Sequence, residues 1–172
     1  MKIAKVRNVK TPVRGTEKSA GLDFFVPNEF KETKLAPQRD LLIPSGIKAK
    51  LPEGYMLMAA DKSGVVTSYQ AAEKAGRKPK AEAFDTVVTL GAKIVDEDYQ
   101  GEIHIHLVNV GNTAVTIKPG MKIAQFILVP VLYETVEVVP EIELFNEVSD
   151  RGDGGFGSTD KNEIEPLEPE VL

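Results

Sequence analysis

Eleven prolines and fourteen glycines divide this 172-residue chain into short apolar runs, and this punctuation favours strands over helices. The clearest run is 102–110, which has apolar side chains at 103, 105 and 107 and polar ones at 102, 104 and 106. Further runs with strand character are 2–6, 41–43, 46–51, 55–59, 114–117, 122–131 and 135–139. Many short strands at this spacing predict an all-β sandwich, jelly roll or barrel.

One segment departs from the β pattern. Residues 68–82 are rich in Ala, Glu and Lys, with Gly76 near the expected end and Pro79 beyond it, which predicts a short helix. Between residues 74 and 80 the segment carries four cations and no acid. We expect a β domain over 1–149 with this insert at about 68–86, a Gly-rich arm over 150–160, and a disordered acidic tail over 161–172.

The composition restricts the function classes. A hydrophobic share of 42% and a charged share of 27% are typical of a soluble globular protein, and no apolar run approaches the ~18 residues of a membrane span. The chain has no cysteine and begins without an apolar signal region, so we expect a cytoplasmic location, or the host cytoplasm if the source is viral. The net charge of −5 disfavours nucleic acid as a partner.

The segment 151–160 reads Arg-Gly-Asp-Gly-Gly-Phe-Gly-Ser-Thr-Asp and has a composition that suits a nucleotide. Glycines let backbone N–H groups approach phosphate oxygens, an arginine can bind a terminal phosphate through two N–H groups, and an aromatic ring can stack on a base. The segment therefore predicts a lid that becomes ordered on its substrate. A mobile Gly-rich linker is the alternative.

Other polar groups interrupt apolar runs at places that suit a site. Lys62-Ser63-Gly64 follows a predicted strand and could bind phosphate, although Ser-Gly turns are common. Asp23 follows a small-residue turn and could equally be an exposed turn residue. Gln125 lies in an apolar strand, so its amide either bonds locally or serves a ligand.

The run 94–102 predicts a β-hairpin that carries Asp96 at a strand end and Tyr99 three residues later, with an acidic hairpin tip as the alternative. His104 and His106 are spaced like a metal-binding pair, but no third ligand stands out, and polar residues on one sheet face are the favoured interpretation. The sequence contains neither a P-loop nor a dinucleotide-binding fingerprint.

In this order, residues 20–23, 62–64, 96–102, 120–125 and 151–159 resemble the five motifs of the trimeric dUTP diphosphatases (dUTPases), and the match runs from about residue 1 to residue 160. The resemblance implies an all-β protomer with a distorted jelly-roll or β-clip fold, assembled as a homotrimer with sites at subunit boundaries. It implies hydrolysis of dUTP to dUMP and pyrophosphate, which limits uracil in DNA and supplies dUMP for dTMP synthesis. Mg²⁺ would be the cofactor, held by the triphosphate and waters with no direct protein ligand.

The resemblance also implies residue roles. Asp96 would orient and deprotonate the water that attacks the α-phosphorus. Tyr99 would pack against the deoxyribose, and the backbone around Ile94 and Val95 would read uracil. Asp23 would support the site indirectly.

The remaining implied roles concern the phosphates and the arm. Ser63, the Gly64 N–H and Gln125 would hold the α- and β-phosphates together with Lys62. In the arm, Arg151, Ser158 and Thr159 would bind the γ-phosphate. Phe156 would stack over uracil, and Gly157 would also contact the substrate.

Three positions or segments depart from the family pattern. Lys62 stands where arginine is usual, after Asp61 where proline is common, so the charge is kept but the planar fork is lost. Leu90 stands where asparagine is frequent, so base recognition would rest more on backbone groups. The insert lengthens the stretch after Gly64.

Two other functions remain open from the sequence. A regulatory protein could use the same nucleotide-binding scaffold and engage a protein partner through residues 68–82, because loops on a rigid scaffold often carry binding. A dCTP deaminase has the related fold, but Asp96, Tyr99 and the Gly-rich arm follow the diphosphatase pattern.

Overall fold

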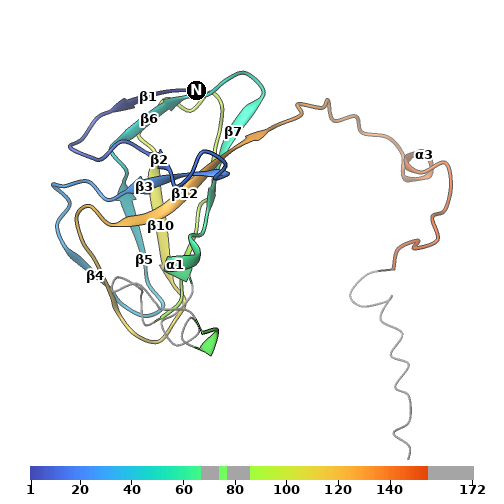
Figure 1. Cartoon of the computed structure of the whole chain (residues 1–172). Helices are drawn as coiled ribbons and strands as arrows, with labels where there is room; N and C mark the ends of the chain where they lie inside the picture. The colour runs from blue at the N-terminus through green and yellow to red at the C-terminus, as the bar shows by residue number, and fades with distance from the viewer. Residues whose placement is uncertain (67–73, 77–85, 155–172) are drawn as a thin grey trace, which may run out of the picture. The chain divides into compact units, whose positions relative to one another are not determined.

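A computed structural model of the chain describes residues 1–66, 74–76 and 86–154. The chain divides into two units, residues 1–133 and 134–172, and every described strand lies in the first unit (Figure 1). Within the described ranges, no helix has the length and apolar character that a membrane crossing needs. The predicted helix at 68–82 lies outside the described residues except for 74–76, where Gly76 has a left-handed φ of 67°.

The first unit is built from antiparallel sheets, which confirms the all-β jelly-roll prediction. The largest has the order β2-β3-β12-β7-β9, with bounds Val13–Arg14, Gly21–Phe25, Lys122–Pro130, Tyr55–Ala60 and Ile94–Val95. A second has the order β5-β10-β8, with bounds Asp40–Pro44, His104–Asn109 and Val88–Leu90. Two strand pairs are β1-β6 and β11-β4, with bounds Lys2–Lys5, Ile47–Lys50, Val115–Ile117 and Thr33–Leu35.

The predicted alternation in 102–110 appears in β10, where Ile105 and Leu107 are buried and His104 is exposed. Most other predicted strands are present with shifted ends, but the prediction of a strand at 135–139 is wrong. That run has no partner strand among the described residues, and an isolated strand leaves its backbone groups unpaired. The short strands β2, β3, β4 and β8 were not predicted as strands, because each offers too few residues for a clear period.

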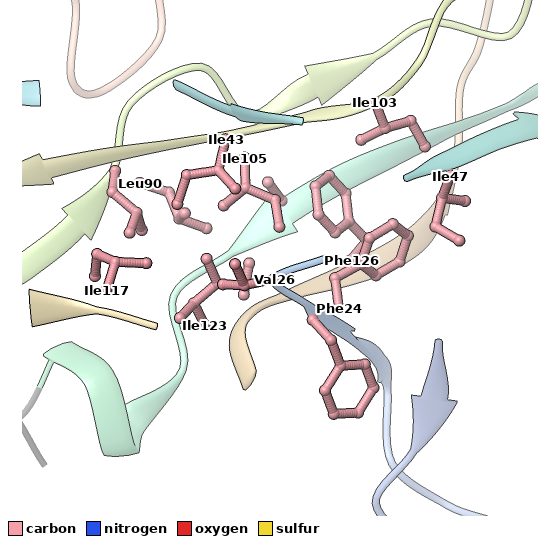
Figure 2. Close-up of a cluster of buried hydrophobic side chains, with 14 of the residues drawn as sticks. Phe24, Val26, Ile43, Ile47, Leu90, Ile103, Ile105, Ile117, Ile123 and Phe126 are labelled. Atoms are coloured by element: carbon pink, nitrogen blue, oxygen red, sulfur yellow. The ribbon is translucent and has the colours of Figure 1, made fainter. Parts of the chain in front are cut away.

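The core lies between the sheets of the first unit. Phe24 and Phe126 pack with ring centroids 4.4 Å apart, and isoleucines from several strands surround them (Figure 2). Full burial of one such side chain contributes about 1.5–3 kcal/mol. Because β3 and β12 supply both core rings and polar groups, the core fixes the position of those polar groups.

The second unit is described only over 134–154. It contains a short helix, α3 (Glu141–Leu144), and a turn in which the N–H of Gly152 donates to the carbonyl of Ser149 at 2.9 Å. Its apolar side chains, such as Val138 and Val148, are about nine-tenths exposed, at 93% each. The predicted tail 161–172 and most of the predicted arm lie outside the described residues.

Candidate active site

Two lysines converge on one buried carboxylate. Asp23 on β3 is only 5% exposed, and its two oxygens accept hydrogen bonds from Lys62 Nζ at 2.5 Å and Lys122 Nζ at 2.8 Å. Burial raises the pKa of Asp23, but the hydrogen bonds from Lys122 and Lys62 outweigh it and leave this pKa below its ordinary value. One negative charge between two positive ones leaves a net positive site.

Gln125 lies beside this carboxylate, opposite Asp23 in the pairing of β12 with β3. Its side-chain amide donates to the carbonyl of Asp61 at 2.9 Å. Gly21 makes room for it, because a Cβ at that position would collide with the Gln125 side chain. Gln125 therefore has the local bond that its position in an apolar strand requires.

The segment predicted to bind phosphate begins one residue after the Gln125 contact. Ser63 and Gly64 open α1 (Ser63–Val66), and the Val65 N–H donates to the Lys62 carbonyl at 2.8 Å. Ser63 is exposed. We name these residues the phosphate cluster after their predicted ligand: Asp23, Lys62, Ser63, Lys122 and Gln125.

The residues predicted to read the base and perform chemistry line one pocket of about 320 Å³. Ile94 and Val95 form β9, and Asp96 and Tyr99 follow in the loop that leads to β10. The segment 94–99 is named the base loop below. The predicted hairpin at 94–102 is wrong in its pairing, because β9 pairs with β7, at Leu57↔Val95 and Met58↔Ile94, whereas β10 pairs with β5 and β8.

A second set of contacts holds the end of the base loop. The Tyr99 hydroxyl donates to the carbonyl of Glu102 at 2.9 Å. The Glu102 carboxylate accepts two hydrogen bonds from Arg7, at 2.6 and 3.0 Å, and one from the Gly46 N–H at 2.7 Å. The hydrogen bond from Arg7 is the largest cause of a lowered pKa of Glu102. Sequence reasoning gave Arg7 and Glu102 no role, because they are 95 residues apart.

Other predicted residues have different surroundings. The Leu90 side chain is 5% exposed and belongs to the core, and its N–H donates to the Asp61 carboxylate at 2.7 Å. His106 donates to or accepts from Asp40 at 3.0 Å, and His104 contacts the Glu102 carbonyl at 2.8 Å.

The arm belongs to the second unit. Arg151 is exposed, and its Nε donates to the carbonyl of Gly154 at 2.8 Å. The other predicted arm residues lie outside the described residues: Phe156, Gly157, Ser158 and Thr159.

Comparisons with known proteins agree with this geometry. A sequence model of the dUTPase family matches residues 71–160. A deoxyuridine 5'-triphosphate nucleotidohydrolase of Fusobacterium nucleatum is 33% identical over 162 residues, which cover 94% of this chain and 97% of the relative. The enzyme of the same name from Hydrogenobaculum is 36% identical over 148 residues, 86% of this chain and 88% of the relative.

The fold also has close structural relatives. A point mutant of the dUTPase of Staphylococcus bacteriophage 80alpha, solved with dUpNHpp, superposes with a TM-score of 0.72 at 22% identity, over 92% of this chain and 96% of that one. The matched family motifs, the full-length sequence relatives and the jelly-roll architecture agree, and the chain belongs to the dUTPase family.

Proposed function

We propose that this protein is a dUTP diphosphatase that hydrolyses dUTP to dUMP and pyrophosphate. The observation that carries the proposal is the single pocket that Ile94, Val95, Asp96 and Tyr99 line together. These are the residues to which the family motifs assign base reading, water activation and sugar packing. The activity places the protein in nucleotide metabolism, where it removes dUTP and supplies dUMP.

The edge position of β9 supports base reading by the backbone. β9 is the outer strand of the five-stranded sheet, and an edge strand presents unpaired N–H and C=O groups. Uracil offers both acceptors and a donor along one edge, so the backbone at Ile94 and Val95 can bind it without a side-chain amide. This suits a chain in which the Leu90 side chain is buried in the core.

Asp96 suits the role of a general base. It is exposed at the pocket, and its carboxylate accepts no hydrogen bond from the described residues, so both oxygens are available to a water. In the proposed reaction Asp96 orients this water toward the α-phosphorus and takes its proton as the bond to the leaving pyrophosphate breaks. Tyr99 packs against the deoxyribose, with its ring held by the hydrogen bond to Glu102.

The phosphate cluster supplies charge and hydrogen bonds for the triphosphate. Lys62, Ser63 and the Gly64 N–H follow one another along the chain, and Gln125 is bonded to the residue before them. Two lysines around one carboxylate leave positive charge for phosphate oxygens. The arm residues Arg151, Phe156, Gly157, Ser158 and Thr159 are proposed to complete the site over the γ-phosphate and the base.

Mg²⁺ is the proposed cofactor. Mg²⁺ is proposed to be held by the triphosphate and waters with no direct protein ligand, because it is a hard cation that keeps most of its waters. Bound Mg²⁺ would neutralise charge on the phosphates. The protein's part is to position the triphosphate and the attacking water.

A homotrimer is the proposed assembly. Large apolar side chains of the second unit are exposed, including Val136 at 88% and Val138 at 93%, and exposed apolar surfaces are typical of protein interfaces. Sedimentation equilibrium of the full chain tests this proposal. A mass of three chains supports it, and a monomer at micromolar concentration contradicts it.

The decisive experiment is pyrophosphate release from dUTP, dCTP, dTTP and UTP in the presence of Mg²⁺. We expect release from dUTP that exceeds release from dCTP by at least about 10²-fold, because a site built to hydrogen-bond uracil leaves polar groups unpaired with cytosine. We also expect dUTP to be preferred over dTTP and UTP, because the 5-methyl of thymine and the 2′-hydroxyl of ribose need space beside the backbone of Ile94 and Val95 and beside Tyr99. Release of ammonia from dCTP would instead indicate a deaminase. A folded protein that acts on none of the four nucleotides would contradict the proposal.

The basic insert is a separate proposal. A protein partner at residues 68–82 is supported by the charge of the segment and by its place between two site motifs. Deletion of 68–82 should leave dUTP turnover unchanged and abolish binding of an acidic partner, if this second role exists. The cytoplasmic location stays a prediction.

A further inference from the structure

Asp61 contacts both halves of the proposed site. It lies between the end of β7 and Lys62, and its backbone carbonyl accepts the hydrogen bond from Gln125 at 2.9 Å. Its carboxylate points the other way: Oδ1 accepts from the Leu90 N–H at 2.7 Å, and Oδ2 accepts from the Thr89 hydroxyl at 3.0 Å. The side chain is 27% exposed, so these bonds are partly shielded from water.

The backbone that follows Leu90 is held step by step until it reaches the base loop. The Gly91 N–H donates to the carbonyl of His106 at 2.8 Å, and the Ala92 N–H donates to the ring of His106 at 3.1 Å. The Lys93 carbonyl accepts from the Ala59 N–H at 2.6 Å, directly before β9 pairs with β7. The Asp61 carboxylate thus makes the first of the hydrogen bonds that hold the backbone between Leu90 and β9.

We propose that Asp61 is a positioning residue that sets the base loop in register with the phosphate-binding turn. The inference rests on the proposed function, because it assigns Asp61 a part in discriminating uracil. A carboxylate suits this role, since a charged acceptor binds a backbone N–H more strongly than a neutral one.

The test compares three variants of the full chain, Asp61→Ala, Asp61→Asn and Thr89→Val, with the wild type. Each is assayed for kcat and KM with dUTP, for the ratio of kcat/KM between dUTP and dCTP, and for hydrogen exchange at the Leu90 amide. Thr89→Val is the matched control, because it removes one donor to Asp61 and leaves the Leu90 bond in place. Asp61→Asn keeps an oxygen acceptor and guards against a misfolded alanine variant.

For Asp61→Ala we expect KM for dUTP to rise about tenfold and the preference for dUTP over dCTP to fall about fivefold, with kcat within about threefold, because the base is misplaced while the carboxylate of Asp96 remains. Exchange at Leu90 should accelerate. Asp61→Asn should lie between Asp61→Ala and the wild type, and Thr89→Val should stay within about twofold of the wild type.

Two results would overturn the proposal. One is an Asp61→Ala enzyme that is less heat-stable but keeps the wild-type KM and nucleotide preference, since this would mean a purely structural role. The other is unchanged exchange at Leu90, which would mean that Asp61 does not hold this amide. Absence of dUTP hydrolysis in the wild type would overturn the proposed function itself, and is seen before any variant is made.

Discussion

The phosphate cluster and the base loop are held in place by different means. In the phosphate cluster the functional side chains bond one another, with Lys62 and Lys122 on Asp23. In the base loop the backbone and a tyrosine hydroxyl carry the fixing contacts, and Asp96 stays exposed. Under the proposed roles, the charges for a charged substrate are organised in advance, and the proposed general base is left accessible to water.

The largest expected effect comes from a substitution in the base loop that removes the proposed general base. Asp96→Asn should lower kcat for dUTP by about 10²–10⁴-fold with little change in KM, because the amide cannot take a proton from water. Steady-state pyrophosphate release measures both constants. Asp98→Asn, the same change two residues away on the same exposed loop, is the matched control and should stay near the wild type. Equal losses in both variants would assign the effect to loop charge.

The next effect separates the two lysines of the phosphate cluster. Lys62→Met should lower kcat/KM for dUTP by about 10–100-fold, the range for one lost charge-assisted hydrogen bond. Lys122→Met should cost only about threefold, because we expect Lys122 to stay on Asp23 when the triphosphate binds. Steady-state kinetics with dUTP measure kcat/KM in both variants, and isothermal titration with a non-hydrolysable dUTP analogue measures the accompanying loss of affinity. A larger loss for Lys122→Met would reverse the roles of the two lysines.

A smaller effect concerns the stability of the protein at acid pH, through the carboxylate of Glu102. The pKa of Glu102 is lowered in the folded protein, so its ionised form stabilises the fold. This stabilisation is complete above the unfolded pKa of about 4. It is lost as the pH falls through the lower pKa of the folded protein. Glu102→Gln should therefore lower the free energy of unfolding by about 1 kcal/mol at pH 7. It should also flatten the acid limb, which is the fall of the free energy of unfolding with pH below pH 7.

Urea unfolding between pH 3 and pH 7 measures the Glu102 effect. Glu53→Gln, at an exposed glutamate, is the control that should keep the wild-type slope. The Asp23 pKa is lowered too, so it adds to the same acid limb in every one of these proteins. Parallel acid limbs for the wild type and Glu102→Gln would contradict the prediction.

The smallest effect tests how the loop is fastened. Tyr99→Phe removes only the hydroxyl that bonds the Glu102 carbonyl, so we expect a loss of about 0.5–1.5 kcal/mol in stability and a rise of a few-fold in KM. Thermal unfolding and dUTP kinetics measure the two quantities. A wild-type KM in this variant would show that the ring alone positions the sugar.

Sequence reasoning identified most of the first unit, and its failures have physical causes. The alternation in β10 and the turn residues were visible in the sequence, because burial on one face produces a period of two. The failed strand at 135–139 has the same alternation without a partner, which no local pattern reveals. Asp61 was noticed only as a departure from the family pattern, and its contact could not be predicted because the amide that it accepts from is 29 residues away.

The sequence motifs identified individual site residues, but they could not predict which of these residues contact one another. The motifs name Asp23, Lys62 and Gln125 at three separate places in the chain. Only strand pairing shows that Gln125 faces Asp23, and only the folded side chains show that Lys122 shares the same carboxylate.

The register of β12 shifts between Lys122 and Ala124, opposite Phe24 and Phe25. In a regular strand, positions 122 and 125 would face opposite sides of the sheet, because side chains alternate with every residue. The extra residue cancels that alternation, so Lys122 and Gln125 both lie on the side of Asp23. Loss of the single codon for Ile123 would leave Lys122 two positions before Gln125, and ordinary alternation would then keep both on the side of Asp23. The damage would fall on the core, which would lose a buried isoleucine, while each named site residue stayed in the gene.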